Sequence, residues 1–283
     1  MKMKADLHLH SNWSDGSMCV SQLVCYAKSL GLDTISITDH DTMSGQKEAL
    51  EEGRRQNLRI IPGVEISAYN PETGRKAHIL GYNVKDMAGL NRACRPFLEA
   101  RSLKNLESTD LIAKHGYAIS RKEVQEYGSL DRTVYRQHIM HALVDRCYTP
   151  TIYGPLYTEL FGPGGLAVVK AFYMSAKEAV YVIRDCGGLA VLAHPFQYDS
   201  MEFIPLLVEW GIAGIEYQHH THTPERREVL LHVAEQYNLF LSGGSDFHGF
   251  YSEKTLALGS VNTELMEDNP LLASQYKNEF IIF

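Results

Sequence analysis

The chain of 283 residues carries 34 acidic and 27 basic side chains, for a formal net charge of -7. This balance disfavours a long nucleic-acid duplex as a partner, because such partners bind basic surfaces. No apolar run approaches the ~20 residues that a membrane span needs, and no signal-peptide pattern follows the first residues. The five cysteines are odd in number and never spaced as CxxC, which indicates a reducing compartment. The sequence therefore predicts a cytoplasmic protein without a membrane partner.

The first third of the chain alternates strand-like and helix-like segments. Residues 4–10 alternate polar and apolar side chains, so Asp6, His8 and His10 should share one face of a strand. We expect strands at 4–10, 34–38, 60–67 and 77–84, and Pro62-Gly63 interrupts the strand at 60–67. We expect helices at 20–30 and 44–56. Gly31 should end the helix at 20–30, and Ser44 should cap the start of the helix at 44–56. This alternation predicts a largely parallel sheet.

The middle of the chain, residues 87–165, changes to helical spacing, with many charges and no cluster of candidate ligands at a strand end. We interpret it as a helical insertion into an α/β domain made of residues 1–86 and 166–283. Beyond it the alternation returns, with helices expected at 175–186, 201–210 and 224–237 and strands at 189–193, 213–218 and 239–242. The apolar end, Ile281-Ile282-Phe283, is expected to dock on the domain.

Nine potential metal ligands lie in short clusters, most of them at the ends of predicted strands: His8, His10, Asp15, His40, Glu65, His78, His194, Asp246 and His248. Buried carboxylates and imidazoles in such numbers would be costly without a compensating cation. Mixed imidazole and carboxylate ligands suit divalent metals that also hold water. We therefore predict one multinuclear metal site, in which Asp39 or Asp41 could orient the ring of His40 from behind.

Six motifs occur in a fixed order along the chain: DLHLHSxxSDG, ITDHDT, GVEIS, AHILGY, LAHP and GGSDFHG. Together they resemble the PHP (polymerase and histidinol phosphatase) superfamily. The segments 136–144 and 187–195 resemble its phosphoesterase branch, whose members hydrolyse nucleoside 3',5'-bisphosphates and, in some cases, short oligonucleotides from the 5' end. The resemblance implies a distorted (β/α)7 barrel with a helical insertion.

The same resemblance implies three ion positions. The first would be held by His8, His10, Glu65 and Asp246, the second by Glu65, His78 and His194, and the third by Asp15, His40 and His248, with Glu65 bridging the first two. Two to three divalent ions are expected, and the ligand types do not choose among manganese, iron and zinc. The chain departs from the branch after residue 144, where the usual Ala-Tyr-Val segment is altered, and at His220, where the branch often has a proline.

Clustered divalent ions favour hydrolysis at phosphorus by a hydroxide bridging two ions, without a protein nucleophile. Bound ions would also outweigh the negative net charge locally and allow a small phosphorylated substrate. Arg136 and His138 are candidates for gripping a second phosphate. His219 and His222 could protonate the leaving oxygen or bind phosphate. For these four residues the alternative is a solvated helix face or surface loop.

The sequence thus predicts a metal-dependent phosphoesterase that acts on a small phosphorylated nucleotide. Three alternatives stay open. One is a histidinol-phosphate phosphatase, which the DFHG loop and the helical insertion make less favoured. A second is a proofreading exonuclease module, although the chain lacks a basic stripe for DNA. The third is a non-catalytic metal-binding regulatory module, which the complete ligand set disfavours.

Overall fold

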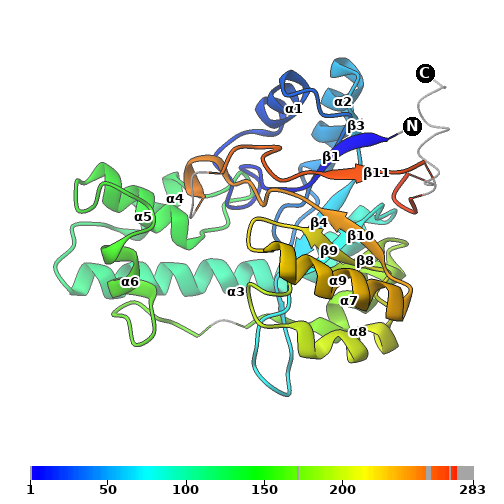
Figure 1. Cartoon of the computed structure of the whole chain (residues 1–283). Helices are drawn as coiled ribbons and strands as arrows, with labels where there is room; N and C mark the ends of the chain where they lie inside the picture. Colours follow the sequence, from blue (N-terminus) through cyan, green and yellow to red (C-terminus); the bar gives the residue numbers. More distant parts are fainter. Residues whose placement is uncertain (1, 171, 253–255, 268, 273–283) are drawn as a thin grey trace.

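The computed structural model describes residues 2–170, 172–252, 256–267 and 269–272 (Figure 1). Within them the chain forms a mixed α/β body built on two main sheets. The first sheet has the order β11-β1-β2-β3. Its strands are β1 (Met3–Leu9), β2 (Thr34–Ile37), β3 (Arg59–Ile60) and β11 (Thr263–Leu265). Strands β1, β2 and β3 are parallel, and β11 closes the edge in the antiparallel direction. The apolar C-terminal tripeptide lies outside the described residues.

The second sheet has the order β10-β9-β8-β6-β4. Its strands are β4 (Gly63–Ile66), β6 (Ile79–Tyr82), β8 (Leu189–Leu192), β9 (Gly214–Gln218) and β10 (Phe240–Gly243). This sheet is mixed rather than largely parallel as predicted, because β6 runs antiparallel to both β4 and β8. The segment between β4 and β6 holds only β5 (Ala68–Tyr69) and turns. Without a crossover helix, a strand returns antiparallel to its neighbour.

The predicted strand at 60–67 is two strands that belong to different sheets. β3 pairs with β2, whereas β4 pairs with β6. Pro62 lacks the N–H that a continuous ladder would need, and the backbone of Gly63 passes so close to Ser36 that a Cβ would lie 2.2 Å from its Oγ. The side chain of Gln46 ties the two sheets together, since its amide donates to the carbonyls of Ile37 and Gly63.

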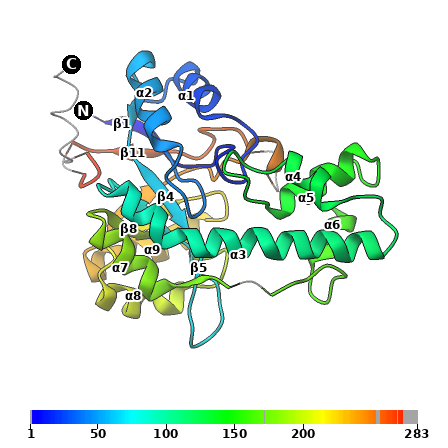
Figure 2. The same ribbon diagram turned by 180° about the vertical axis from the view of Figure 1, so that it is seen from behind.

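Helices cover the outer faces of the sheets. α1 (Val20–Ser29) and α2 (Gln46–Gln56) pack beside the first sheet, and α7 (Ala176–Asp185), α8 (Ile204–Trp210) and α9 (Pro224–Tyr237) pack beside the second (Figures 1 and 2). α9 begins and ends where the sequence predicts. α2 begins two residues later than predicted, with Gly45 rather than Ser44 as its N-cap. In the described part of the chain, no helix has both the length and the apolar character to cross a membrane.

The segment predicted as an insertion is helical. It contains α3 (Met87–Lys114), α4 (Arg121–Glu126), α5 (Arg136–Asp145) and α6 (Pro155–Phe161). α3 is long and joins two cores (Figure 2). Leu90 and Cys94 near its start pack with the apolar residues of the second sheet, whereas Ile112 near its end packs with those of α4–α6. This geometry holds α5 and α6 at a fixed place beside the sheets.

Candidate metal centre

Two isolated bridges bring the ends of the sheets together. Leu9 bridges Phe247 and His40 bridges Glu65, each in the parallel sense. The residues next to Leu9 and Phe247 in the chain are candidate ligands, so these bridges bring four of the predicted clusters together. Four groups of described residues have ligand atoms within 4.8 Å of one another, and together they contain all nine candidates: His10, Asp15, His40 and His248; His8, His10 and Asp246; His8, Glu65 and His194; His40, Glu65 and His78.

Glu65, at the third position of β4, is the centre of this arrangement. Its Oε1 lies 2.8 Å from Nδ1 of His78 and 2.8 Å from Nε2 of His194. Its Oε2 lies 3.4 Å from Nε2 of His8, 3.4 Å from Nε2 of His10 and 3.1 Å from Nδ1 of His40. The carboxylate thus faces residues from both sheets with both of its oxygens. This is the geometry of a group that can bridge two ions.

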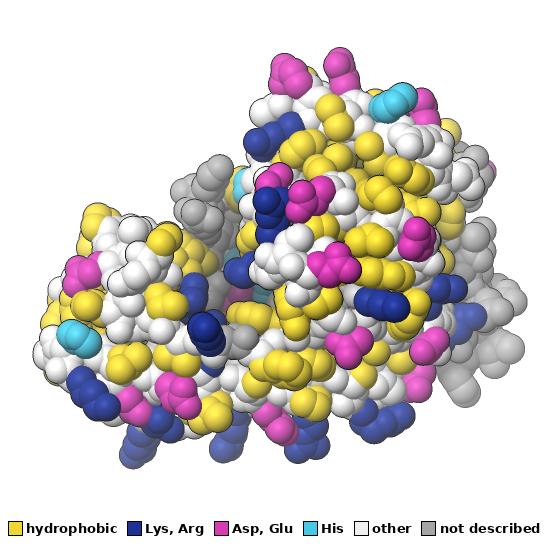
Figure 3. Space-filling view, turned by 90° about the horizontal axis from the view of Figure 1, so that it is seen from below, with side chains coloured by type: hydrophobic (Ala, Val, Ile, Leu, Met, Phe, Trp, Pro, Cys, Tyr) yellow, Lys and Arg dark blue, Asp and Glu magenta, His cyan; other side chains and the backbone are white. Residues whose placement is uncertain are grey.

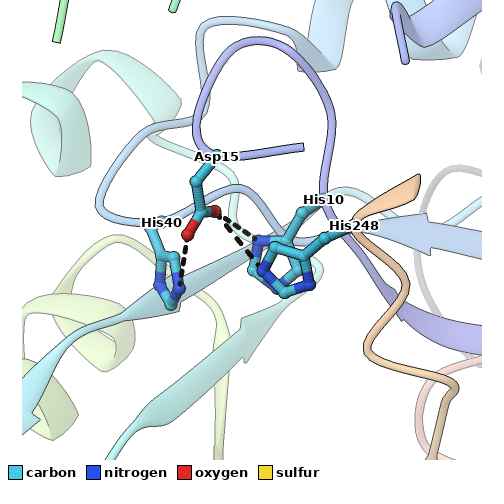
Figure 4. A group of neighbouring side chains, drawn as sticks. All are labelled: His10, Asp15, His40 and His248. Atoms are coloured by element: carbon cyan, nitrogen blue, oxygen red, sulfur yellow. Dashed lines mark ion pairs between the residues drawn. The ribbon is translucent and has the colours of Figure 1, made fainter. Parts of the chain in front are cut away.

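Asp246 and Asp15 complete the cluster on either side. Oδ1 of Asp246 lies 3.4 Å from Nε2 of His8 and 3.2 Å from Nε2 of His10. Asp15 reaches between the rings of His40 on one side and His10 and His248 on the other (Figure 4). The distances from its oxygens to these three rings are 3.8, 3.7 and 3.4 Å respectively.

Several of these atoms are buried without a hydrogen bond, which is unusual for polar groups. They include Nε2 of His8, both ring nitrogens of His10 and Oδ1 of Asp15. A cation among them would satisfy the lone pairs that the protein leaves without partners. Because the free donors are imidazole nitrogens and carboxylate oxygens, the residues present fit divalent metal ions.

The electrostatics of the cluster also require positive charge. Burial would raise the pKa of Glu65, but the neighbouring histidines, His40 first among them, outweigh burial and hold the pKa well below its usual range. Burial opposes protonation of His10, but the carboxylates of Asp246 and Glu65 beside its ring raise its pKa to about 10. Without a metal, protons on the histidines therefore balance the carboxylates. Metal ions would do so with fuller coordination.

Buried hydrogen bonds hold the loops that carry the ligands. Asp39 accepts hydrogen bonds from Ser11 and Ser14, in the loop that ends at Asp15. Asp6 accepts from the backbone and hydroxyl of Ser245, the residue before Asp246. Asp39 therefore orients the Asp15 loop rather than the ring of His40, and Ser245 ties the loop of Asp246 to β1 through Asp6.

Asp41 likewise turns away from the ring of His40. Its carboxylate accepts from the backbone of Ser67 and from Nη2 of Arg101, at 2.9 and 2.6 Å. Asp41, His194 and Asp246 have positive φ angles of 58°, 23° and 55°. Such backbone conformations cost free energy in non-glycine residues and cluster at functional sites. The fold therefore stabilises strained backbone at three points around the cluster.

Glu216 is a buried residue of this site that sequence reasoning did not single out. It lies in the middle of β9, where its Oε1 is 2.9 Å from Nδ1 of His8 and its Oε2 accepts from the backbone N–H of His194 at 2.7 Å. Burial would raise the pKa of Glu216, but the charge and hydrogen bond of His8 lower it to about 2. The signal in the sequence was a carboxylate between Ile215 and Tyr217, inside a predicted strand.

A cavity of about 430 Å³ opens beside the cluster, between the sheets and the helical segment. Figure 3 shows the hollow, with Lys and Arg side chains near its mouth. His40, Glu65, His78, His194, Asp246 and His248 form part of its wall, and four basic residues face them from other elements: Lys76, Arg101, Lys104 and Arg136. The cavity therefore combines a cluster of metal-binding side chains with a second wall of positive charge.

The four predicted substrate-contacting residues lie in different environments. Arg136 lines the cavity and stacks on the ring of Phe161. His138 is buried and caps α5 instead, because its Nδ1 accepts from the backbone N–H of Tyr135. Burial lowers the pKa of His138 to about 4. Gln137 lines the cavity between them, and its amide donates to Asp15 and to the hydroxyl of Tyr153.

His219 and His222 are buried and are not among the described residues that line the cavity. Nε2 of His219 lies 3.5 Å from Oδ2 of Asp246, so His219 contacts a candidate ligand. Nδ1 of His222 is bonded to the carbonyl of Tyr217, and burial lowers its pKa to about 4. His220, between them, lines the cavity.

Comparison with known proteins identifies similar sequences and structures. The family model described as "PHP domain" matches residues 6–184. Several curated relatives match most of the chain. A phosphoribosyl 1,2-cyclic phosphate 1,2-diphosphodiesterase of Eggerthella lenta is 40% identical over 87% of this chain and 95% of its own. A 5'-3' exoribonuclease of Haemophilus influenzae is 32% identical over 88% and 91%. A 3',5'-nucleoside bisphosphate phosphatase of Chromobacterium violaceum is 27% identical over 86% and 86%.

Among solved structures, a candidate metal-dependent phosphoesterase of Bifidobacterium adolescentis superposes with a TM-score of 0.84 at 27% identity, over 92% of each chain. The mixed α/β architecture is therefore that of PHP-like proteins.

Proposed function

Because the chain belongs to the PHP domain family and is a phosphoesterase, we propose that it hydrolyses a phosphate ester on a small ribose phosphate compound that carries a second phosphate. A nucleoside 3',5'-bisphosphate is the first candidate. The observation that carries this proposal is the cavity, which has metal-binding side chains on one wall and four basic side chains on another. Its volume lies in the range of small-molecule sites.

The nine clustered side chains would hold two to three divalent ions of manganese, iron or zinc. The proposed first site is His8, His10, Glu65 and Asp246, the second is Glu65, His78 and His194, and the third is Asp15, His40 and His248. When bound, the ions supply an activated water and neutralise charge on the phosphoryl oxygens. The protein's part is to fix the ligands on strand ends, so that little reorganisation accompanies the reaction.

The basic wall would hold the second phosphate. Arg101 is fixed by its ion pair with Asp41 and by the rings of Tyr135 and Tyr173, 5.1 and 5.5 Å from its guanidinium carbon. Its buried Nε has no hydrogen-bond partner, so a phosphate oxygen could accept from it. Arg136 at the start of α5 and Lys104 on α3 stand beside it in the cavity wall. In this proposal His138 is a helix cap, and His219 positions Asp246 rather than contacting substrate.

We also propose a barrel fold and a division of the chain into a barrel domain and a helical insertion. The Leu9–Phe247 and His40–Glu65 bridges support the distorted (β/α)7 barrel that the family resemblance implies. The separate core of α4–α6 supports a helical insertion within residues 87–165, on a barrel domain of residues 1–86 and 166–283. Lys and Arg line a small cavity rather than a long stripe, which supports a small substrate over duplex nucleic acid.

A ribose phosphate without a base is the second candidate, because the relative at 40% identity is named for phosphoribosyl 1,2-cyclic phosphate. Tyr153 and Tyr157 line the cavity with ring centroids 4.7 Å apart, and such rings suit the stacking of a base. The purified protein would be assayed for hydrolysis of a nucleoside 3',5'-bisphosphate, phosphoribosyl 1,2-cyclic phosphate, histidinol phosphate and a 5'-phosphorylated trinucleotide. Products would be identified by chromatography and mass spectrometry, because hydrolysis of a phosphodiester leaves a monoester and releases no inorganic phosphate. Turnover of histidinol phosphate alone would contradict the proposal.

The Tyr157→Ala variant distinguishes a nucleotide substrate from a ribose phosphate without a base. If a base stacks on the tyrosines, Tyr157→Ala should raise KM for the bisphosphate about tenfold, since stacking contributes about 1–3 kcal/mol per base. KM for the cyclic ribose phosphate should be unchanged. Tyr181→Ala, an exposed tyrosine on α7, is the matched control. Equal effects of Tyr157→Ala on both compounds would argue against a base site there.

Lys104 should make substrate binding depend on pH. Burial, together with the charges of Arg136 and Arg101, lowers the pKa of Lys104 to about 7. Lys104 carries its charge below that pH and loses it above, so KM for a phosphorylated substrate should rise between pH 6 and 8. The rise should be about tenfold, from the loss of one charged hydrogen bond. Lys104→Arg stays charged throughout and should flatten the profile; identical profiles for the two proteins would exclude this contact.

A further inference from the structure

We propose that Glu216 is a positioning residue that holds one ligand of the proposed first metal site and one ligand of the second in place at the same time. The inference rests on the metal ligands proposed above. Glu216 is fully buried in β9 and is not among the described residues that line the cavity. It therefore contacts neither substrate nor the open side of the cluster, and any effect of its carboxylate passes through the residues it touches.

The contact with His8 fixes the ring of that residue. Oε1 of Glu216 can only accept a hydrogen bond, so Nδ1 of His8, 2.9 Å away, must carry the proton. The lone pair is then left on Nε2, which lies 3.4 Å from both Glu65 and Asp246. A carboxylate behind a metal-binding histidine sets the tautomer and the ring orientation in this way.

The contact with His194 fixes a strained backbone. His194 follows β8 directly and has a φ of +23°, which a histidine rarely adopts. Oε2 of Glu216 accepts from the backbone N–H of this residue at 2.7 Å. The ring of His194 then meets Oε1 of Glu65 at 2.8 Å. Because strained conformations persist only where neighbours stabilise them, Glu216 helps to keep this ring at the cluster.

Among the described residues, the hydrogen bonds and ion pairs of Glu216 are with His8 and His194 and not with Asp15, His40 or His248. The third proposed site has its own support. Asp15 accepts from Gln137, and the hydroxyl of Tyr135 donates to the carbonyl of His40. The loss of Glu216 should therefore weaken the first two metal sites and leave the third largely unchanged. A purely structural role would predict no such selectivity.

The test is metal content, measured by elemental mass spectrometry after dialysis of metal-loaded protein. Glu216→Gln keeps the size of the side chain but has only one oxygen that can accept a hydrogen bond. If that oxygen faces Nδ1 of His8, the amide nitrogen faces the N–H of His194 and cannot accept from it. We expect it to lose at least one ion per chain that the wild type retains, with dissociation constants raised about 10- to 100-fold. Excess metal should restore turnover without a change in KM. Glu228→Gln, on the exposed face of α9, is the control.

The circular dichroism of metal-free Glu216→Gln shows whether it folds. If it does not, Glu216→Asp, which retains the charge but is too short to reach both partners, takes its place with the same expected loss of metal. Unchanged ion content and affinity in the folded variant would overturn the inference while leaving the metal centre intact. A wild-type protein that retains no ions would instead overturn the metal centre itself.

Discussion

Glu65→Gln should reduce turnover by at least about 10³-fold. Both carboxylate oxygens of Glu65 face histidines, His78 and His194 through one and His8, His10 and His40 through the other. The amide cannot bridge two ions, and a bound metal contributes several kcal/mol to the stabilisation of the transition state. At about 1.4 kcal/mol per factor of ten, a loss of about 4 kcal/mol corresponds to that reduction.

Turnover would be measured with saturating substrate and added metal, alongside elemental analysis of the same samples. Glu48→Gln, an exposed residue of α2, is the control and should behave as the wild type. Glu65→Gln should stay folded, as judged by circular dichroism, because its packing volume is unchanged. If the variant retained activity within tenfold of the wild type, the central role of Glu65 would be wrong.

Removal of metal should destabilise the protein, and more so as the pH rises. In metal-free protein the pKa of His10 is raised to about 10, because the carboxylates of Asp246 and Glu65 beside its ring outweigh its burial. A histidine whose pKa is raised by folding stabilises the fold fully below its unfolded value of about 6.5. That stabilisation is lost as the pH rises through about 10. Bound ions take the place of these protons and bind better to deprotonated imidazole.

The difference in Tm between metal-loaded and chelator-treated protein should therefore widen from pH 6.5 to pH 9. Ions present at a few hundred times their dissociation constant contribute about 3 kcal/mol. At about 2–4 °C per kcal/mol for a chain of this size, the difference should reach roughly 10 °C at pH 9. Return of the metal should restore the Tm. A Tm that chelation leaves unchanged at every pH would show that no ions stabilise this fold.

The candidate ligands could be found from the sequence because most of them lie near the end of a strand. His8 and His10 alternate with Leu7 and Leu9, and a period of two places them on one face. The carboxyl ends of parallel strands meet, and the amino end of the antiparallel β6, which His78 precedes, lies beside them, so ligands far apart in the chain converge. The division of 60–67 between two sheets and the antiparallel β6 could not be predicted, because each depends on which strands become neighbours.

The residues that hold the candidate ligands in place or line the cavity were harder to predict. Glu216 acts on His8, 208 positions away in the chain, and no local pattern marks such a pair. In α5 the sequence identifies a polar turn but not its orientation, since successive helical residues point about 100° apart. Gln137 thus reaches the cavity while His138 caps the helix. The same ambiguity in a loop explains why His220 rather than its neighbours His219 and His222 lines the cavity.

X-ray diffraction from metal-loaded crystals, with anomalous scattering recorded at the absorption edges of manganese, iron and zinc, tests the central claim most directly. We expect at least two anomalous peaks within about 2.0–2.3 Å of imidazole nitrogens or carboxylate oxygens of the nine residues, with Glu65 shared between two of them. Crystals grown with metal that show no peak beside Glu65, or peaks only on the surface, would contradict it.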